Sequence, residues 1–196
     1  VYAANNGWQA ESVYRVRIKI LKASALERAE IKIRYYSRGR AQEISGINGI
    51  SFNLDATGKI TETRMEKSAV FDKVIDKETS EISFALPDVK VGTVFEYKYK
   101  MLRKSFGYIP AWQFQQRIPV KYSSYNIVIP EYFHFSVQTT ARQRIETKEG
   151  RYATEGTWYI MRNIPGLKEE PHSSGIKNYL QRIEFQLTKI QTDSYY

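Results

Sequence analysis

Cysteine is absent from this sequence of 196 residues. Its absence excludes disulfide bridges, thiolate metal sites and a cysteine nucleophile from the chain itself, and it leaves the redox compartment open. Long hydrophobic runs are absent as well, since no apolar stretch approaches the roughly 20 residues that a membrane-spanning helix needs. We therefore expect no membrane span in this chain.

Neither end of the sequence carries an ordinary terminal signal. The first residues, VYAANNGWQAE, have neither the basic nor the apolar region of a signal peptide, and the chain does not begin with methionine. We interpret the start as that of a mature or trimmed product. The last residues, IQTDSYY, form neither a helix cap nor a closing strand, so we expect the polypeptide to continue.

Near-neutral bases are scarce, because His134 and His172 are the only histidines. His134 lies in an alternating run, YFHFSV, and is interpreted as an ordinary strand residue. His172 has Glu169, Glu170 and two serines beside it, the one place where a base, carboxylates and hydroxyls meet. Neighbours on an extended chain point in opposite directions, however, so proximity in sequence does not build a triad or a metal cage.

Catalytic motifs are missing too. The sequence contains no G-x-S-x-G nucleophile turn, no phosphate-binding glycine loop and no H-E-x-x-H. We predict no catalytic residue, no metal site and no cofactor, and we keep Glu169, Glu170 and His172 as candidates for binding.

What the sequence does contain is alternation with a period of two. In VFEYKYKM, Phe95, Tyr97, Tyr99 and Met101 share one side, and charged residues share the other. This spacing predicts a strand with one buried face. Similar runs recur along the chain without long amphipathic helices between them, which favours an all-β fold, an antiparallel sandwich with little helix. We expect a single large domain over residues 1–196.

Several local expectations follow from the same pattern. Residues 13–21 and 29–37 are predicted to be antiparallel neighbours, joined by a short connection with one helical turn. Residues 49–65 read as a hairpin in which Ile50, Phe52 and Leu54 alternate and Asp55 to Gly58 form the turn. Residues 69–81 are ambiguous, with a short helix as one interpretation.

The segment from Asn163 to Leu187 is predicted to be a hinge to whatever follows. Pro165 and Pro171 interrupt strand pairing on either side of an exposed turn at residues 168–170. Residues 179–187 fit both a helical and a strand spacing, and we choose a terminal strand because apolar and polar residues alternate there. Four prolines, at 110, 119, 130 and 165, fall at run boundaries, which fits strand ends or edge strands.

The charge balance permits an anionic partner. Lysine and arginine number 30 against 21 acidic residues, a net charge of +9, which suits nucleic acid, an acidic glycan or a membrane surface. Most of these cations form the polar half of alternating runs, and we interpret them as solvated strand faces. Their dispersal makes nucleic acid the least favoured partner. The cations in question are Arg15, Arg17, Lys19, Lys32, Arg34, Lys98 and Lys100.

Aromatic residues are abundant, with 15 Tyr, 9 Phe and 3 Trp. Most keep phase with aliphatic neighbours, as strand residues do. Trp8, Trp112 and Trp158 are the least constrained by phase, so they are the candidates for stacking on a sugar or a base. An alternative function is therefore recognition of an acidic polysaccharide or peptidoglycan fragment by tryptophan stacking and a basic face.

Three stretches carry a family resemblance: residues 86–101, 109–133 and 163–187. They contain V-x-x-G-T-V-F-E-Y after a proline, W-x-F-Q leading into I-P-V-x-Y-S-x-Y and I-P-E-Y-F, and K-E-E-P before I-E-F-Q-L. In this order they resemble the β-rich domain of uncharacterised function at the N-terminus of transglutaminase-like envelope proteins, especially those of Gram-negative gut bacteria. The resemblance spans residues from about Trp8 to Gln191.

The resemblance implies an immunoglobulin-like β-sandwich that is exported to the periplasm or outer envelope. It also implies a papain-like, transglutaminase-like catalytic domain further along the same polypeptide as partner, whose Cys, His and Asp lie outside this sequence. The expected function of the chain itself is that of a non-enzymatic accessory or interaction module.

Overall fold

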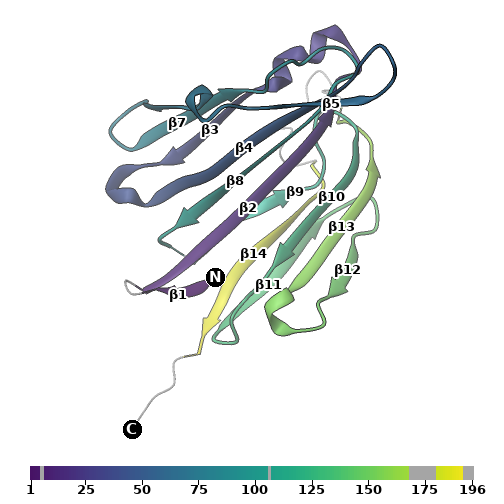
Figure 1. Cartoon of the computed structure of the whole chain (residues 1–196). Coiled ribbons are helices and arrows are strands. Elements are labelled where there is room, and N and C mark those ends of the chain that lie inside the picture. Colours follow the sequence, from purple (N-terminus) through teal and green to yellow (C-terminus); the bar gives the residue numbers. More distant parts are fainter. Residues whose placement is uncertain (5–6, 106, 168–179, 192–196) are drawn as a thin grey trace, which may run out of the picture. The chain divides into compact units, whose positions relative to one another are not determined.

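The computed structural model describes residues 1–4, 7–105, 107–167 and 180–191 (Figure 1). These residues are mostly β, every strand pair among them is antiparallel, and helix is confined to short 3-10 segments. The expected all-β, antiparallel fold with little helix is confirmed at this level. Contacts group the chain into an N-terminal unit, residues 2–105, and a C-terminal unit, residues 106–196 with Val1. The single domain over residues 1–196 stays a prediction.

The N-terminal unit has two sheets. Its strands are β1 (Tyr2–Ala4), β2 (Gly7–Lys19), β3 (Glu30–Tyr36), β4 (Gln42–Leu54), β5 (Ile60–Arg64), β6 (Phe71–Val74), β7 (Thr79–Ala85) and β8 (Val94–Arg103), with 3-10 helices η1 (Ala23–Ala29), η2 (Arg38–Arg40) and η3 (Lys67–Ala69). A five-stranded sheet has the order β1-β2-β8-β4-β5, and a three-stranded sheet has the order β3-β7-β6. The two sheets share one core, in which Ile33 and Phe84 of the smaller sheet join Phe95 and Met101 of the larger.

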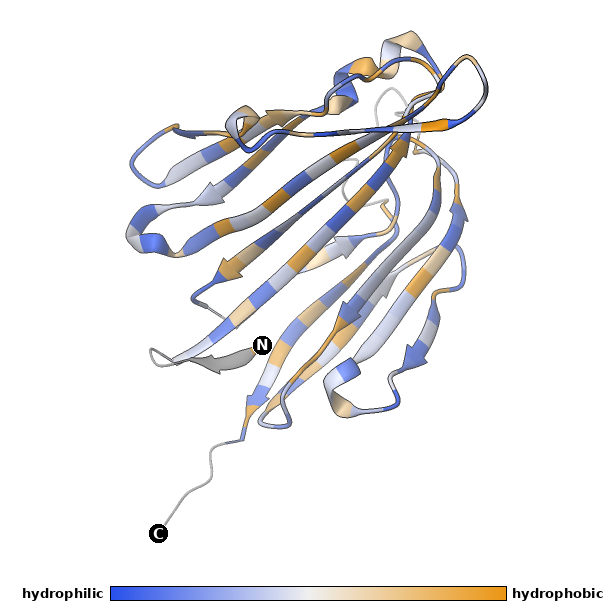
Figure 2. Cartoon of the chain, in the orientation of Figure 1, coloured by the Kyte–Doolittle hydropathy of each residue, from blue (hydrophilic) through white to orange (hydrophobic). Residues whose placement is uncertain are grey.

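The alternating run at residues 94–103 is confirmed as strand β8. Phe95 and Met101 are buried, whereas Lys98 and Lys100 on the other side are exposed. The bands of alternating hydropathy along β2 and β4 in Figure 2 have the same origin, because successive side chains of a strand point to opposite faces. The strand is central in its sheet, between β2 and β4.

The pairing expected for residues 13–21 and 29–37 is wrong. β2 pairs with β1 and β8, and β3 pairs with β7 in the other sheet. The connecting residues do form the expected short helix, η1, and it carries the chain from one sheet to the other. Alternation shows which face of a strand is buried but not which strand lies beside it.

Residues 49–65 form the predicted hairpin of β4 and β5. Its turn is fixed by the Asp55 carboxylate, which accepts hydrogen bonds from the Thr57 hydroxyl (2.6 Å) and the Lys59 amide (3.0 Å). The hydrophobic pattern does not identify the buried face of β4, because Ser51 and Asn53 are buried while Leu54 is 65% exposed.

The short helix considered for residues 69–81 is wrong. Residues 71–74 are strand β6, which pairs with β7 across a turn. The Asp76 carboxylate accepts hydrogen bonds from the amides of Glu78 and Thr79, both at 2.8 Å. An aspartate that binds backbone amides two and three residues ahead stabilises a turn and so competes with a helix.

The C-terminal unit also has two sheets. Its elements are β9 (Tyr108–Gln113), β10 (Val120–Ile127), β11 (Phe133–Thr140), β12 (Glu146–Glu149), η4 (Ala153–Glu155), β13 (Thr157–Ile164) and β14 (Arg182–Ile190). One sheet has the order β10-β13-β12 and the other β11-β14-β9. They share a core of their own, with Met161 and Ile164 from one sheet and Ile183 and Phe185 from the other.

The terminal strand predicted at the end of the chain is confirmed as β14, and it is the central strand of its sheet. Pro110 lies in β9, an edge strand, where a residue without an amide proton is tolerated. The exposed turn predicted at residues 168–170 and Pro171 lie outside the described residues.

Candidate functional site

Trp112 is held inside the C-terminal unit. Its indole Nε1 donates a hydrogen bond to Ser123 Oγ (3.1 Å), and its ring stacks on Tyr125 with the centroids 5.6 Å apart. It also packs against the core that contains Ile183. These contacts bind the two sheets of the unit together, which is a structural role.

Trp8 and Trp158 lie in different units. Trp8 is half-buried in β2, opposite Ala3 of β1. Trp158 is 37% exposed in β13, between Asn126 and Lys148 of the neighbouring strands. Of the three tryptophans, Trp158 presents its ring to solvent most openly, and a ligand-stacking role for any of them stays a prediction.

Trp158 belongs to the outward face of the β10-β13-β12 sheet. Tyr122 on this face is 48% exposed, and the Arg162 guanidinium lies over its ring at 4.9 Å. Arg162 Nε also lies 3.5 Å from the Glu146 carboxylate. The Asn126 side chain also has a partner, because its Nδ2 donates a hydrogen bond to the Glu155 carbonyl (2.8 Å). The face therefore offers two aromatic rings with fixed polar groups around them.

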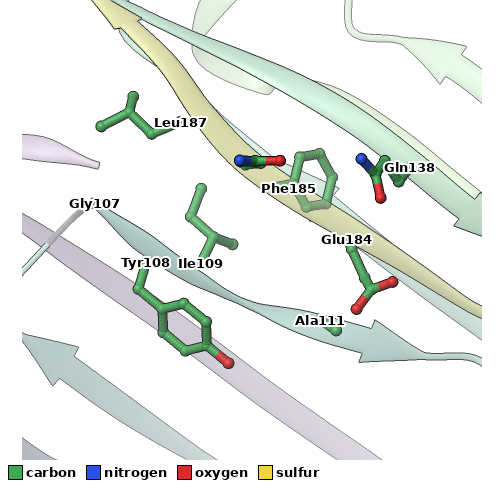
Figure 3. A pocket seen from close by; sticks show the side chains of 9 residues that line it. Gly107, Tyr108, Ile109, Ala111, Gln138, Glu184, Phe185 and Leu187 are labelled. Atoms are coloured by element: carbon green, nitrogen blue, oxygen red, sulfur yellow. The ribbon is translucent and has the colours of Figure 1, made fainter.

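A groove of about 360 Å³ opens between β9 and β14 (Figure 3). Its origin is local: Pro110 has no amide proton to donate, and the pairing shifts between Ile183 and Phe185, where β14 carries Glu184. The Glu184 carboxylate is paired with Arg182 Nε at 2.9 Å. The groove is lined by Gly107, Tyr108, Ile109, Ala111, Gln138, Glu184, Phe185, Gln186 and Leu187.

The lining of this groove holds few groups that could take part in catalysis. Glu184 is the one carboxylate among its lining residues, and neither histidine nor a serine or threonine hydroxyl stands beside it. This carboxylate already pairs with Arg182, so the lining residues contain no pair of a nucleophile and a base.

The remaining sequence candidates are not placed. Glu169, Glu170 and His172 lie outside the described residues, so their binding role stays a prediction. His134 is exposed in β11, opposite Lys189. The described residues contain no group of three or more His, Asp or Glu side chains arranged to hold a metal ion. None of the described helices is long and apolar enough to cross a membrane.

The shifted pKa values belong to structural groups. Burial raises the pKa of the Tyr97 and Tyr99 phenols in the core of the N-terminal unit, and burial followed by the charge of Glu149 raises that of Tyr159. The direction of these shifts follows from burial, because the charged phenolate is the less favoured form in an apolar setting.

The V-x-x-G-T-V-F-E-Y stretch has a structural explanation. Gly92 has a φ of +96°, a conformation that favours glycine. Thr93 is fully buried, and its hydroxyl donates to Asn53 Oδ1 at 2.5 Å. Asn53 Nδ2 in turn donates to the Asp88 carbonyl (2.8 Å) and carboxylate (2.9 Å). These bonds fasten the connection between β7 and β8 to β4, and nothing in the sequence pattern singled out Asn53.

Cations that the sequence spreads over two segments meet in one sheet. Arg15 of β2 lies directly opposite Lys98 of β8, and Arg17 lies opposite Glu96. The sequence alone predicts solvated strand faces for these cations and does not bring them together, because no local feature encodes the pairing of β2 with β8.

Residues 8–165 match a family described as "Domain of Unknown Function with solved-structure structure (DUF3857)". The chain belongs to this family. The match covers the first two of the three stretches that carried the resemblance, and it confirms the resemblance to a β-rich domain of uncharacterised function. No curated protein matches the chain.

A solved structure is similar to most of this DUF3857 chain. It is the crystal structure of "a putative protease from Parabacteroides distasonis", with a TM-score of 0.72 and 17% sequence identity over 94% of this chain. At this identity the similarity shows a shared fold. The chain spans 38% of the length of that protein.

Proposed function

We propose that this chain is a non-catalytic accessory module of a longer, exported bacterial envelope protein that carries a transglutaminase-like catalytic domain. The observation that carries the proposal is the partial coverage of the similar structure: 94% of this chain corresponds to 38% of a protein described as a protease. The remainder of such a protein is large enough for a catalytic domain of its own.

The chemistry of the described residues supports an accessory role. Neither the β9–β14 groove nor the outward face around Trp158 combines a nucleophile with a base, and the sequence has no cysteine. A papain-like reaction requires a cysteine thiolate and a histidine in contact. The catalytic partner of the proposal is therefore another domain of the same polypeptide.

The immunoglobulin-like arrangement and the location in the periplasm or outer envelope belong to this proposal. What supports the first is that each unit consists of two antiparallel sheets around a shared core. The second follows from the resemblance to envelope proteins and is tested by fractionation of cells that express the full-length protein, in which the proposal expects the protein in the envelope fraction and not in the cytoplasm.

The test uses the full-length protein and the amide hydrolysis that it catalyses. We expect the sequence beyond residue 196 to supply a cysteine whose replacement by alanine abolishes turnover. His172→Ala, in contrast, should leave the kcat for a small soluble substrate unchanged. A loss of turnover in H172A that matches the loss in the cysteine variant would assign catalysis to this chain and overturn the proposal.

A second candidate function is glycan binding on the outward face of the β10-β13-β12 sheet. The observation that favours it is the presence of two exposed aromatic residues, Trp158 and Tyr122, on the same face of one sheet, with the Arg162 guanidinium over the Tyr122 ring. Trp158 lies four positions before Arg162, the residue opposite Tyr122, so the two aromatic positions lie roughly 13 Å apart along the strands. Aromatic rings on such a face suit the apolar sides of separate sugar units in an extended glycan chain.

Tryptophan fluorescence during a titration with soluble peptidoglycan fragments tests this candidate. We expect a saturable change that Trp158→Ala abolishes. Tyr152→Ala, which removes an exposed aromatic from the β12–β13 connection, is the matched control and should leave the titration unchanged. No response at about 1 mM ligand would dismiss the candidate.

A further inference from the structure

The outward face of the five-stranded sheet in the N-terminal unit gathers cations. On β2 the outward residues include Arg15, Arg17 and Lys19, and on β8 they include Lys98 and Lys100. β2 and β8 are adjacent, so these five side chains occupy two neighbouring strands. We call this group the basic face.

Only part of this charge is compensated. Arg17 binds Glu96 with a nitrogen–oxygen distance of 2.6 Å, and Lys100 lies 3.3 Å from Glu11. Arg15, Lys19 and Lys98 have no carboxylate partner among the described residues. Arg15 and Lys98, moreover, lie directly opposite each other.

Like charges at directly opposed positions of a sheet destabilise it. The arrangement of Arg15 and Lys98 therefore costs stability, and neither side chain forms an ion pair among the described residues that would offset the cost. A negatively charged surface placed against the basic face would offset it, because both cations would then face opposite charge.

Exposed aliphatic side chains continue the same face. On β4 and β5, Leu54 and Ile60 lie opposite each other and are 65% and 62% exposed. The row next to this pair begins at Lys19 and continues through Val94 and Phe52 to Glu62, whose carboxylate lies 3.7 Å from the Arg64 guanidinium. The face is thus cationic on β2 and β8 and apolar at the end of the β4–β5 hairpin.

We propose that this face binds the surface of an anionic lipid bilayer. Arg15, Lys19 and Lys98 meet the phosphate groups of the lipids, and Leu54 and Ile60 enter the boundary between head groups and acyl chains. The charge of the chain, +9, adds a longer-range attraction. A soluble polyanion would complement the cations but leave the aliphatic pair in water, whereas an apolar protein partner would leave the cations unmatched. This inference does not rest on the proposed accessory function.

Cosedimentation with vesicles tests the proposal directly. The probe is a phosphatidylcholine vesicle with about 30% phosphatidylglycerol, since each cation near such a surface contributes roughly a fivefold gain in affinity. We expect binding that fails on pure phosphatidylcholine and weakens as salt rises from about 0.05 to 0.5 M. The double variant Arg15→Gln/Lys98→Gln should bind more than tenfold more weakly.

The matched control removes the same charge from the other sheet of this unit. Lys32→Gln/Lys73→Gln replaces two exposed lysines of β3 and β6 and should keep at least half of the affinity. The R15Q/K98Q variant should also melt at the same or a higher temperature than the parent, because it removes a repulsion. A lower melting temperature would mean that these cations stabilise the chain itself and would contradict the proposal.

The hairpin residues distinguish a bilayer from a soluble polyanion. Leu54→Ser/Ile60→Ser should weaken vesicle binding several-fold and leave binding to dextran sulfate unchanged. An equal loss of vesicle affinity in R15Q/K98Q and K32Q/K73Q would overturn the proposal. Vesicle binding that L54S/I60S leaves unchanged would overturn it too and would point to a soluble polyanion as the partner. Absence of vesicle binding would overturn it outright.

Discussion

Asn53 fixes the connection between β7 and β8 through three hydrogen bonds, to Asp88 and Thr93. Asn53→Ala would remove these bonds and leave the buried Thr93 hydroxyl without its acceptor, so we expect a loss of about 2 kcal/mol in the free energy of unfolding. Leu54→Ala, one residue away but 65% exposed, should change it by less than about 0.5 kcal/mol. Urea unfolding of both variants measures the difference. A larger effect of L54A would mean that the hydrophobic pattern, and not the hydrogen bonds, marks the core face of β4.

Asp55 gives the β4–β5 turn a dependence on pH. The Thr57 hydroxyl, and after it the amides of Lys59 and Thr57, hold the pKa of this carboxyl below its ordinary value. A depressed pKa contributes stability above the pKa of the unfolded chain, about 4, and this contribution is lost as pH falls through the lower folded value. Asp55→Asn should therefore flatten the change of melting temperature between about pH 4 and 2. Parallel profiles for the two proteins would refute this.

At the scale of the element, β14 is expected to be indispensable for the C-terminal unit. It is the central strand of its sheet, and it and the residues before it bury Leu180, Ile183 and Phe185. Deleting the chain from Tyr179 onward should cost several kcal/mol, at roughly 1.5–3 kcal/mol for each buried apolar side chain. Circular dichroism melting checks this. An unchanged melting temperature would show that the segment is a detachable linker.

Strands were predictable and their partners were not. The run from Phe95 to Met101 alternates because one face of β8 is buried, and the sequence carries that information at every position. The pairing of β2 with β8 joins residues about 80 positions apart, and no local feature encodes it. Asp76 shows a second limit of prediction from the sequence pattern. Its carboxylate accepts hydrogen bonds from two backbone amides and forms a turn, in a segment that also had a helical interpretation.

Site residues were predictable to a smaller extent than strands. The sequence singled out Trp158, which is exposed, together with Trp112, which is packed between sheets. Residue type is the same for both, and what separates them is the face of the sheet on which each lies, outward for Trp158 and toward the core for Trp112. Predicting that Arg15 lies opposite Lys98 would need the register of β2 and β8. Predicting the β9–β14 groove would need the shift in pairing at Glu184.

At the scale of the whole molecule, each unit has its own core. Phe95→Ala empties a fully buried site in the N-terminal unit, at a cost of about 3 to 5 kcal/mol. We expect hydrogen exchange to rise in residues 7–105 and to remain unchanged in β13 and β14. Equal loss of protection in both units would instead establish the single cooperative domain that the sequence predicts.

We propose that this DUF3857 chain supports catalysis by another domain and has no turnover of its own. The most direct measurement is turnover of peptide and amide substrates by the purified chain of residues 1–196, followed by mass spectrometry over an extended incubation. We expect no more product than forms in buffer alone, both with the parent chain and with His172→Ala. Product that forms with the parent chain and disappears in H172A would contradict it.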